Sequence, residues 1–302
     1  MWKWKRNRTR VAAPVMSIAM ALAIAGCGTQ DQAKPAKADA KAPYFHLLPE
    51  KIAKAGSVVV ATNATYPPIE YMSEDNKTII GFDPDLGAAL GKQLGVEMKF
   101  VNVTEFDAII PGLVAGRYDI AMAFISDLKE RYDKVHFIDY FEDRAVLMVS
   151  AKNPAGIASF SDLCGRTVVV QKGAVTESRT AEAPNAECAA AGKAPVNIVQ
   201  LPAATDKQTQ LKSGRADAAI TNVPNASYLV KNAPADFKIV GEPIEAPGSH
   251  IGIAVPAQDT KLRDAIKAAL QSLIDSGEYK TLLERYDLED GAVPAAVING
   301  DG

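Results

Sequence analysis

The chain is poor in the side chains that usually hold metal ions. Its 302 residues include three cysteines and three histidines. His46, His136 and His250 lie far apart and no Cys-x-x-Cys pair occurs, so the ligand spacing of common zinc sites is missing. No paired acids and no Ser–His arrangement indicate a catalytic centre. We therefore expect no metal site, no cofactor and no catalytic residue.

The start of the chain also lacks an apolar run long enough to cross a membrane. Val11–Ile24 is nearly all apolar, but it is 14 residues long, whereas a membrane-spanning helix needs roughly 20. The first ten residues carry five basic and no acidic side chains. Basic residues, a short apolar core and small residues at its end predict a secretory signal peptide over residues 1–26.

A single cysteine, Cys27, directly follows Ala25 and Gly26. This order resembles the lipobox of bacterial lipoproteins, which implies cleavage before Cys27 and a diacylglyceryl anchor on this residue. The alternative is an ordinary signal peptide with an unrelated cysteine. With the anchor, the protein would be extracytoplasmic and attached to the cell membrane.

The residues after Cys27 have the composition of a tether. Gly28–Lys41 consists of Ala, Lys, Gln, Asp, Thr, Gly and Pro without periodicity. Such a segment cannot bury enough apolar surface to fold. We therefore predict a flexible linker over residues 27–55.

A strong positive charge is missing as well. Without the five basic residues of the predicted signal peptide, 28 basic residues stand against 36 acidic ones, a net charge of −8. Charges scattered in this way argue against nucleic acid as a partner, because nucleic-acid binding needs clustered Lys and Arg. The remaining length suits two domains of ordinary size.

The other two cysteines are Cys164 and Cys188. In an exported protein an isolated pair of cysteines usually forms a disulfide, and we predict one here. Metal binding is the alternative, which the distant histidines make the weaker interpretation.

A repeated phrase, Leu-x-x-Gly-Arg-x-Asp-x-Ala, occurs at Leu113–Ala121 and again at Leu211–Ala219. Each copy is typical of a helix end, a capping glycine and a short apolar strand. In open α/β sheets, ligands bind beyond the carboxyl ends of the strands. The repeat therefore predicts two similar α/β lobes that face one cleft, although such a joint is common enough to recur by chance.

The hydrophobic pattern around both copies predicts alternating strands and helices. The expected strands are Ser57–Thr62, Val96–Val103, Asp119–Phe124, Arg166–Gln171, Val196–Leu201, Ala216–Thr221 and Ile251–Val255. The expected helices are one that Asp83 caps and Gly95 ends, Phe106–Ala115, Val175–Ala183, Asp206–Ser213, and a long one through Leu262 and Ile274. This order is typical of mostly parallel sheets.

Several motifs recur in one known family. They are Ala64–Tyr71 (ATYPPIEY), Gly81–Leu86 (GFDPDL), Phe106–Leu113 (FDAIIPGL), Glu130-Arg131, Ser161–Gly165, Gly214–Ala218 and Leu262–Ala265. With them, the chain from about Gly56 to Val293 resembles the bacterial extracellular solute-binding proteins of the polar amino-acid type, which are the binding subunits of ABC importers.

The resemblance implies a class α/β fold of the two-lobed periplasmic-binding-protein type (type II), with two mixed lobes joined by two hinge strands. Lobe 1 would comprise residues 56–144 and 250–302, including a C-terminal tail, and lobe 2 residues 145–249. It also implies a monomer that captures a small carboxylate-bearing solute, such as an amino acid, by hinge closure. The protein would then deliver this solute to an ABC permease in the membrane.

The resemblance places the ligand's carboxylate on Arg131, whose guanidinium offers a two-pronged match to that group. Ser126 stands where the family has a hydroxyl for the same carboxylate, and Leu128 replaces a frequent Thr. In lobe 2, the turn from Gln171 to Thr176 would offer amide and hydroxyl donors at a helix N-terminus. The alternatives are a surface arginine and a plain strand–helix turn.

Tyr66 and Phe106 stand where the family places aromatic rings against the ligand's side chain. The alternative is that either ring belongs to the core. Phe124, a further expected pocket residue, replaces a small residue of the family pattern.

At two expected site positions this chain has an amide side chain where the family often has an acid. Asn222 replaces the Asp that commonly binds the ligand's α-ammonium, and Asn63 stands where members that recognise polar side chains often carry an acid. Asp143-Arg144 stands where a hinge glycine is more usual. We therefore expect a more positive and bulkier cleft, which weakens the case for a zwitterionic amino acid and leaves room for an anionic or less basic ligand.

Two other functions fit this fold. A ligand sensor would present its bound form to a separate signalling protein. An exported dehydratase would need an acid or base at the cleft, and Asn63 and Asn222 remove the best-placed carboxylates.

Overall fold

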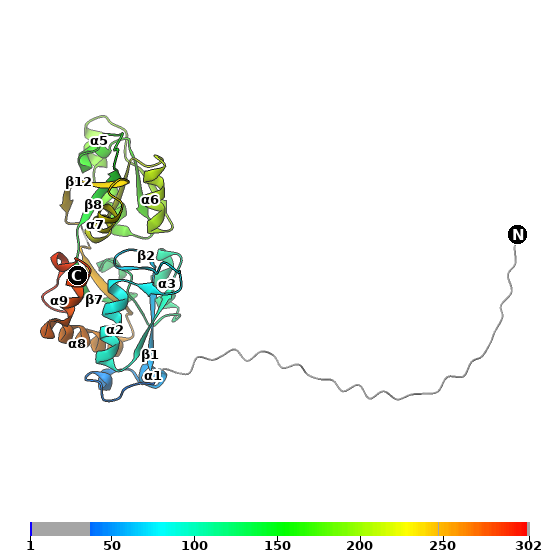
Figure 1. Ribbon diagram of the computed structural model, residues 1–302, viewed down its shortest axis with the longest axis vertical. Helices are drawn as coiled ribbons and strands as arrows, with labels where there is room; N and C mark the ends of the chain where they lie inside the picture. The colour runs from blue at the N-terminus through cyan, green and yellow to red at the C-terminus, as the bar shows by residue number, and fades with distance from the viewer. Residues whose placement is uncertain (2–36, 247, 301–302) are drawn as a thin grey trace. The chain divides into compact units, whose positions relative to one another are not determined.

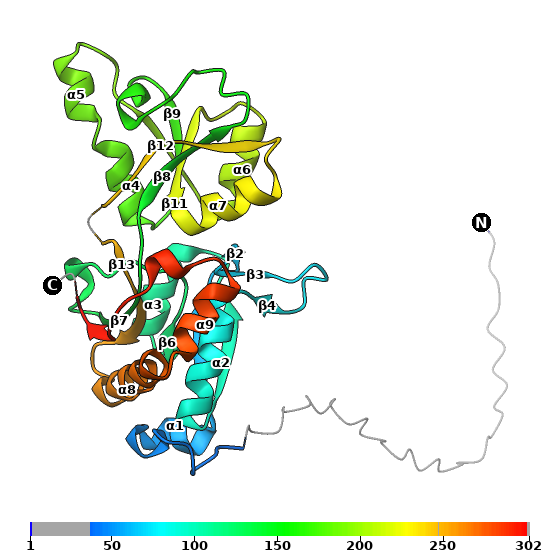
Figure 2. The same cartoon turned by 60° about the vertical axis from the view of Figure 1, so that its left-hand side comes forward.

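Figures 1 and 2 show the computed structural model of the chain, which describes Met1 and residues 37–246 and 248–300. The chain divides into two units, Met1–Lys34 and Pro35–Gly302. The predicted signal peptide, apart from Met1, and the predicted lipidation site Cys27 lie outside the described residues. Within those residues, no helix combines the length and the apolar character that crossing a membrane requires.

Lobe 1 is built on a sheet with the strand order β14-β7-β13-β6-β1-β5. Its strands are β1 (Ser57–Thr62), β5 (Glu97–Asn102), β6 (Ile120–Ala121), β7 (Val135–Glu142), β13 (His250–Pro256) and β14 (Val297–Ile298). Its helices are α1 (Glu50–Ala55), α2 (Phe82–Leu94), α3 (Ile109–Val114), α8 (Thr260–Ser276) and α9 (Glu278–Arg285). Strand β1 is parallel to β5 and β6, whereas β13 is antiparallel to β6 and β7.

Lobe 1 also carries a small antiparallel sheet and several 3-10 helices. The small sheet consists of β2 (Thr65–Tyr66), β3 (Glu70–Met72) and β4 (Ile79–Ile80). The 3-10 helices are η1 (Phe45–Leu47), η2 (Phe106–Ala108), η3 (Lys129–Arg131) and η5 (Glu289–Gly291). Of these, η2 and η3 carry residues of the predicted site.

Lobe 2 is built on a second sheet with the strand order β10-β9-β11-β8-β12. Its strands are β8 (Ala145–Ser150), β9 (Thr167–Gln171), β10 (Asn197–Leu201), β11 (Ala218–Asn222) and β12 (Phe237–Ile244). Its helices are η4 (Phe160–Leu163), α4 (Val175–Glu182), α5 (Asn185–Ala190), α6 (Ala204–Lys212) and α7 (Val223–Asn232).

Two segments connect the lobes, residues 143–144 between β7 and β8 and the chain between β12 and β13, of which residues 245–246 and 248–249 are described. Figure 2 shows the first segment joining β7 of one sheet to β8 of the other. Each lobe has its own buried apolar core beside its sheet. The predicted α/β fold of two lobes joined by two hinge strands is confirmed.

The repeated sequence phrase has the same structural role in both lobes. In each copy a glycine with positive φ, Gly116 or Gly214, follows the helix. The carboxylate of Asp119 then accepts a hydrogen bond from the amide of Val59 (2.8 Å), and that of Asp217 accepts one from Thr167 (2.8 Å). Each Asp thus joins its strand, β6 or β11, to the start of the neighbouring parallel strand.

The helix α2 starts differently from the prediction. Its N-cap is Gly81 and not Asp83, and the helix begins at Phe82. The amides of Phe82 and Asp83 donate to the carbonyl oxygens of Pro68 (3.1 Å) and Ile69 (2.9 Å), so no side-chain cap is needed. The Asp83 carboxylate turns inward, where it is fully buried and accepts a hydrogen bond from Tyr140 Oη (2.8 Å).

The substitution Asp83→Asn is expected to weaken the pH dependence of stability. Burial raises the pKa of Asp83 to about 7, against about 4 in an unfolded chain. Its contribution is therefore fully present below pH 4 and is lost as the pH rises through 7. Urea unfolding at pH 5 and pH 8 should show the variant gaining stability over the native protein at pH 8.

The exposed Asp133 supplies the control for this experiment. Asp133→Asn should leave the difference between pH 5 and pH 8 unchanged. An Asp83→Asn variant that changes stability equally at both pH values would contradict a buried, proton-binding Asp83.

The last part of the predicted flexible linker is folded. Residues Phe45–Leu47 and Glu50–Ala55 form η1 and α1, and Leu48 and Ile52 are buried in the core of lobe 1. The physical reason is composition, because the apolar residues that follow Lys41 can bury surface that Gly28–Lys41 lacks. Residues 27–36 of the predicted linker lie outside the described residues.

The predicted disulfide is present between Cys164 and Cys188. It joins the end of η4 to α5, where Cys188 is fully buried. The bond closes a loop with a sequence separation of 24 residues in lobe 2.

Replacing both bridged cysteines by serine is expected to lower the free energy of unfolding by roughly 3 kcal/mol, because the unfolded loop regains its conformational freedom. The measurement is the urea midpoint of the Cys164→Ser/Cys188→Ser variant. Cys27→Ser is the control and should leave that midpoint unchanged. Equal midpoints for oxidised and reduced protein would contradict a stabilising bridge.

Candidate ligand-binding site

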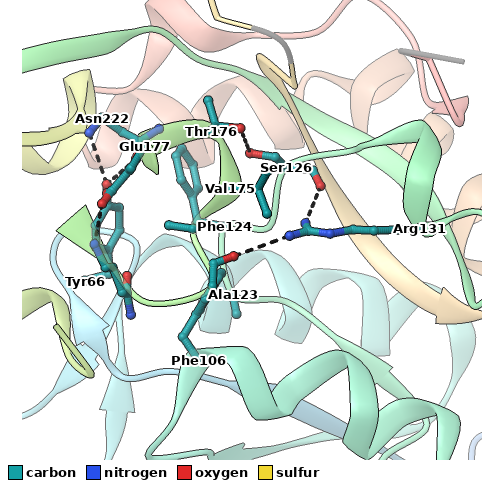
Figure 3. Close-up of a pocket in the computed structure, with 13 residues that line it drawn as sticks. Tyr66, Phe106, Ala123, Phe124, Ser126, Arg131, Val175, Thr176, Glu177 and Asn222 are labelled. Carbon is teal, nitrogen blue, oxygen red and sulfur yellow. Dashed lines mark hydrogen bonds between the residues drawn. The ribbon is translucent and has the colours of Figure 1, made fainter. Parts of the chain in front are cut away.

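A pocket lies between the two lobes, just beyond the carboxyl ends of β6, β9 and β11 (Figure 3). The residues that line it are Tyr66, Phe106, Ala123, Phe124, Ser126, Arg131, Gln171, Gly173, Ala174, Val175, Thr176, Glu177 and Asn222. The fold thus brings together every predicted ligand-binding residue except Asn63. Glu177 is the one ionisable pocket residue that the sequence did not predict.

Arg131 provides the positive charge at one end of this pocket. It ends η3, and its guanidinium donates to the carbonyl oxygen of Ser126 (2.9 Å) and, across the cleft, to that of Gly173 (3.4 Å) (Figure 3). Burial lowers the pKa of the guanidinium. Among the described residues none forms an ion pair with Arg131, although the negative charges of Glu130 and Asp127 raise its pKa and the positive charge of Arg179 lowers it.

Hydroxyl groups of both lobes lie on the side of the pocket that holds Arg131. Thr176 Oγ1 donates to Ser126 Oγ at 3.0 Å, and this bond joins lobe 2 to lobe 1. Thr176 lies in the first turn of α4, whose N-terminal residues line the pocket. The N-terminal end of a helix favours negative charge, so a carboxylate would find a guanidinium, two hydroxyls and a helix N-terminus here.

Asn63 lies behind the pocket and does not line it. Its side chain is 1% exposed, and its Nδ2 donates to the carbonyl oxygens of Val103 (2.8 Å) and Thr104 (3.1 Å). Its Oδ1 accepts from Gln171 Nε2 at 3.1 Å, which is a further bond between the lobes. An Asp here would face two carbonyl oxygens without a proton to donate, which explains why this position carries an amide.

Aromatic rings form the pocket wall in lobe 1. Tyr66 and Phe124 have ring centroids 5.9 Å apart, and Phe124 lies 5.3 Å from the ring of Phe141. Phe124 has a φ of 49° and is 7% exposed, so a bulky side chain occupies a backbone conformation that favours glycine. Tyr66 belongs to the buried core of lobe 1 and Phe106 packs against a second apolar cluster, so both rings line the pocket and also belong to the packed interior.

Asn222 ends β11 opposite Tyr66. Its Oδ1 accepts a hydrogen bond from Tyr66 Oη, while its Nδ2 donates to a carboxylate oxygen of Asp143. Tyr66 Oη also lies 3.0 Å from Thr221 Oγ1. Burial raises the pKa of Asp143, and the negative charge of Glu177 raises it further.

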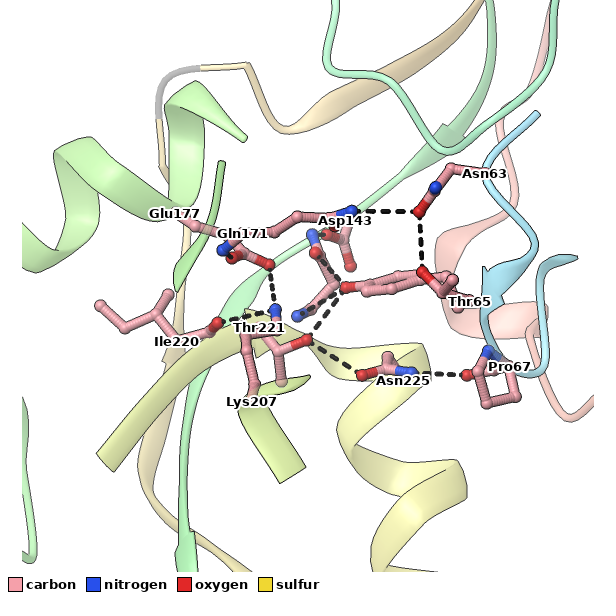
Figure 4. A network of polar contacts seen from close by, with 12 residues as sticks. Asn63, Thr65, Pro67, Asp143, Gln171, Glu177, Lys207, Ile220, Thr221 and Asn225 are labelled. Atoms are coloured by element: carbon pink, nitrogen blue, oxygen red, sulfur yellow. Dashed lines mark hydrogen bonds and ion pairs between the residues drawn. The ribbon is translucent and has the colours of Figure 1, made fainter. Parts of the chain in front are cut away.

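Glu177 forms a buried ion pair with Lys207 of α6. Their side chains are 7% and 1% exposed, and Lys207 Nζ lies 2.6 Å from Glu177 Oε1. The other oxygen, Oε2, accepts from the amide of Gln171 (2.7 Å), and Lys207 also donates to the carbonyl oxygen of Ile220 (3.1 Å). Figure 4 shows this pair beside the Asp143 carboxylate.

These contacts change the expected charge of the cleft. The sequence predicts a more positive cleft because Asn63 and Asn222 replace acids. The structure, however, places two buried carboxylates, Asp143 and Glu177, beside Asn222, and one of them is paired with Lys207. The pocket therefore has a positive end at Arg131 and an acidic end at Asn222.

Side chains of the two lobes also form ion pairs with each other. Ion pairs join Arg179 to Glu130 (2.6 Å), Lys172 to Asp107 (2.9 Å) and Lys231 to Asp287 (2.6 Å). Each pair has one partner in each lobe. This structure is thus a closed form of the two lobes.

Metal coordination has no counterpart among the described residues. They contain no group of three or more His, Cys, Asp or Glu side chains that could hold a metal ion.

Comparisons with known proteins agree with this architecture. The sequence model of the bacterial extracellular solute-binding proteins, family 3, matches residues 58–289. The arginine-binding protein ArgT of Corynebacterium glutamicum is 30% identical over 253 residues, which cover 84% of this chain and 81% of ArgT.

Solved structures give the same result. An ancestral arginine-binding protein bound to arginine has a TM-score of 0.68 and 33% identity, with 76% of this chain and 98% of that chain covered. The ancestral amino-acid-binding protein AncCDT-1, a precursor of cyclohexadienyl dehydratase, has a TM-score of 0.66 and 31% identity, with 78% and 98% covered. The chain belongs to the bacterial extracellular solute-binding proteins of family 3.

Proposed function

We propose that this protein is the extracytoplasmic receptor of an ABC importer and captures an amino acid or an amino-acid-like carboxylate between its lobes. The observation that carries this proposal is the half-buried Arg131 guanidinium, which lines a cleft between the lobes and forms no ion pair among the described residues. A cation that loses part of its hydration without an ion-pair partner is costly, and a carboxylate ligand would remove that cost. The bidentate geometry of Arg suits this group in particular.

Closure of the two lobes around the ligand would produce the form that the permease recognises. A ligand that contacts Arg131 and Ser126 in lobe 1 and the N-terminal turn of α4 in lobe 2 binds the closed form more tightly than the open form. The three ion pairs between the lobes are exposed, so each contributes little to closure and the ligand contacts would supply most of it. The closed form would then dock on the permease and release its ligand there.

The relatives support an amino acid as the ligand class. ArgT is named as an arginine-binding protein, and an ancestral arginine-binding protein of 33% identity is bound to arginine. The acidic end of the pocket, at Asn222 and Asp143, fits a ligand that also carries an ammonium group.

We further infer that the protein is not an enzyme. Glu177 is the one acid that lines the pocket, and both of its oxygens are used by Lys207 and by the amide of Gln171. A general acid or base must exchange a proton with its substrate, and an acid held in this way is poorly suited to that role.

A single lipid on Cys27 would attach the monomer to the membrane near its permease.

The test is thermal unfolding of the purified protein with a series of L-amino acids, their 2-hydroxy acids and their decarboxylated amines. A ligand at 100 times its Kd should stabilise the protein by about 2.7 kcal/mol. This corresponds to a shift in Tm of roughly 5–10 °C for lobes of this size. At least one carboxylate should bind, and the amine without a carboxylate should not. Equal shifts for an acid and its decarboxylated amine would overturn the proposal.

A further inference from the structure

We propose that Asp143 supplies the negative charge for the α-ammonium group of the ligand, acting through Asn222. This inference rests on the proposed function, because it takes a carboxylate on Arg131 as given. In this view Asp143 is a positioning residue of the binding site. It lies in the hinge, and the family motifs in the sequence do not point to it.

The backbone brings Asp143 and Asn222 together. Strands β8 and β11 are antiparallel neighbours, and Ala145 lies opposite Asn222 in their register. The amide of Val223 donates to the carbonyl oxygen of Arg144 (3.0 Å), which joins the hinge to the end of β11. Asp143 lies two residues before Ala145, so the two side chains start from diagonal positions on the same face, within reach of each other.

The Asp143 carboxylate is buried without a matching cation. It is 7% exposed, its Oδ2 accepts from Asn222 Nδ2, and its Oδ1 has no hydrogen-bond partner. Among the described residues no Lys, Arg or His forms an ion pair with it. The charge of Arg144 and the amides of Arg144 and Val223 lower the pKa of Asp143, but burial outweighs them and favours the neutral form. A cation that arrives next to this carboxyl group favours its ionised form, and the group then offers a buried negative charge to that cation.

Asn222 lies between the Asp143 carboxyl group and the pocket. Because its Nδ2 donates to Asp143, its Oδ1 points the other way, towards Tyr66 in the pocket wall. An amide oxygen has two lone pairs, so Oδ1 can accept from an ammonium as well as from Tyr66. The ammonium would then lie one amide group away from the Asp143 carboxylate, inside a pocket where charges act strongly.

The other acid of the pocket cannot take this role. Glu177 is neutralised by Lys207 at 2.6 Å, and its second oxygen holds the amide of Gln171. The acid at position 143 also explains why position 222 carries Asn where the family commonly has Asp. An Asp at position 222 would place a second carboxylate against Asp143, and two adjacent buried carboxylates repel each other.

The test compares each L-amino acid with its 2-hydroxy acid, in which a hydroxyl replaces the ammonium. Isothermal titration of the native protein should show that the amino acid binds at least ten times more tightly. Asp143→Asn should weaken binding of the amino acid by about 10- to 100-fold and change that of the 2-hydroxy acid by less than threefold. The exchange variant Asp143→Asn/Asn222→Asp returns the acid to the strand end and should recover most of the loss.

Glu142→Gln is the matched control, because this acid adjoins Asp143 but is exposed at the end of β7. It should bind both ligands like the native protein. Two results would overturn the inference. The first is that the native protein binds 2-hydroxy acids more tightly than amino acids. The second is that Asp143→Asn weakens the binding of both ligands equally. In the first case the proposed capture of a carboxylate stands, whereas binding of neither ligand class would overturn both proposals.

Discussion

Replacing Arg131 by methionine is expected to weaken binding of the carboxylate ligand by about 2–5 kcal/mol, or roughly 30- to several-thousand-fold. Methionine fills part of the same space but offers no donor, so the ligand carboxylate would lose its charged partner on burial. Among the described residues, the guanidinium donates hydrogen bonds to the carbonyl oxygens of Ser126 and Gly173. The measurement is isothermal titration with the best ligand of the thermal series.

Arg117→Met is the matched control, because Arg117 belongs to the same lobe but is exposed outside the pocket. It should bind the ligand with native affinity. Unchanged binding in Arg131→Met would show that the carboxylate lies elsewhere. Thermal unfolding without ligand distinguishes this effect from loss of structure, since Arg131→Met breaks no ion pair among the described residues.

Replacing Lys207 by methionine is expected to lower the free energy of unfolding by about 3–5 kcal/mol, because it leaves the buried Glu177 carboxylate without its cation. The side chain of Lys207 is 1% exposed and lies 2.6 Å from Glu177 Oε1. Urea unfolding at pH 7 measures this loss.

Lys212→Met supplies a control on the same helix. Lys212 pairs with Asp236 at 2.6 Å, but both side chains are largely exposed, so its loss should cost less than about 1 kcal/mol. The double variant Lys207→Met/Glu177→Gln should recover much of the lost stability. Equal effects of Lys207→Met and Lys212→Met would contradict a buried ion pair beneath the ligand pocket.

Elements with a clear local pattern could be predicted from the sequence. Strand β1 has the predicted bounds Ser57–Thr62, and α2 ends at Gly95, where a glycine with φ of 70° closes the helix. The apolar spacing of Leu86, Leu90 and Leu94 places all three in the core. Such features depend on side chains a few residues apart, which a single sequence displays directly.

Strands β7, β8, β12 and β14 of the two large sheets escaped prediction, as did the short strands β2, β3 and β4. Strands β7 and β8 are buried on both faces over most of their length, so they lack the alternation of polar and apolar residues that marks a half-buried strand. Their pairing partners are β13 and β11, far away in the chain. The local pattern therefore did not indicate these strands, although the resemblance to the family predicted two hinge segments.

The binding site divides in the same way. Arg131, Ser126 and the aromatic wall could be predicted because each stands in a recognisable local motif. The buried pair of Glu177 and Lys207 and the contact of Asp143 with Asn222 could not, because they join residues 30 and 79 positions apart. Motifs in the sequence thus identify the family and the Arg131 end of the pocket. The charge at its other end depends on which side chains the two sheets bring together. Burial lowers the local dielectric constant and so strengthens the interactions between charges there.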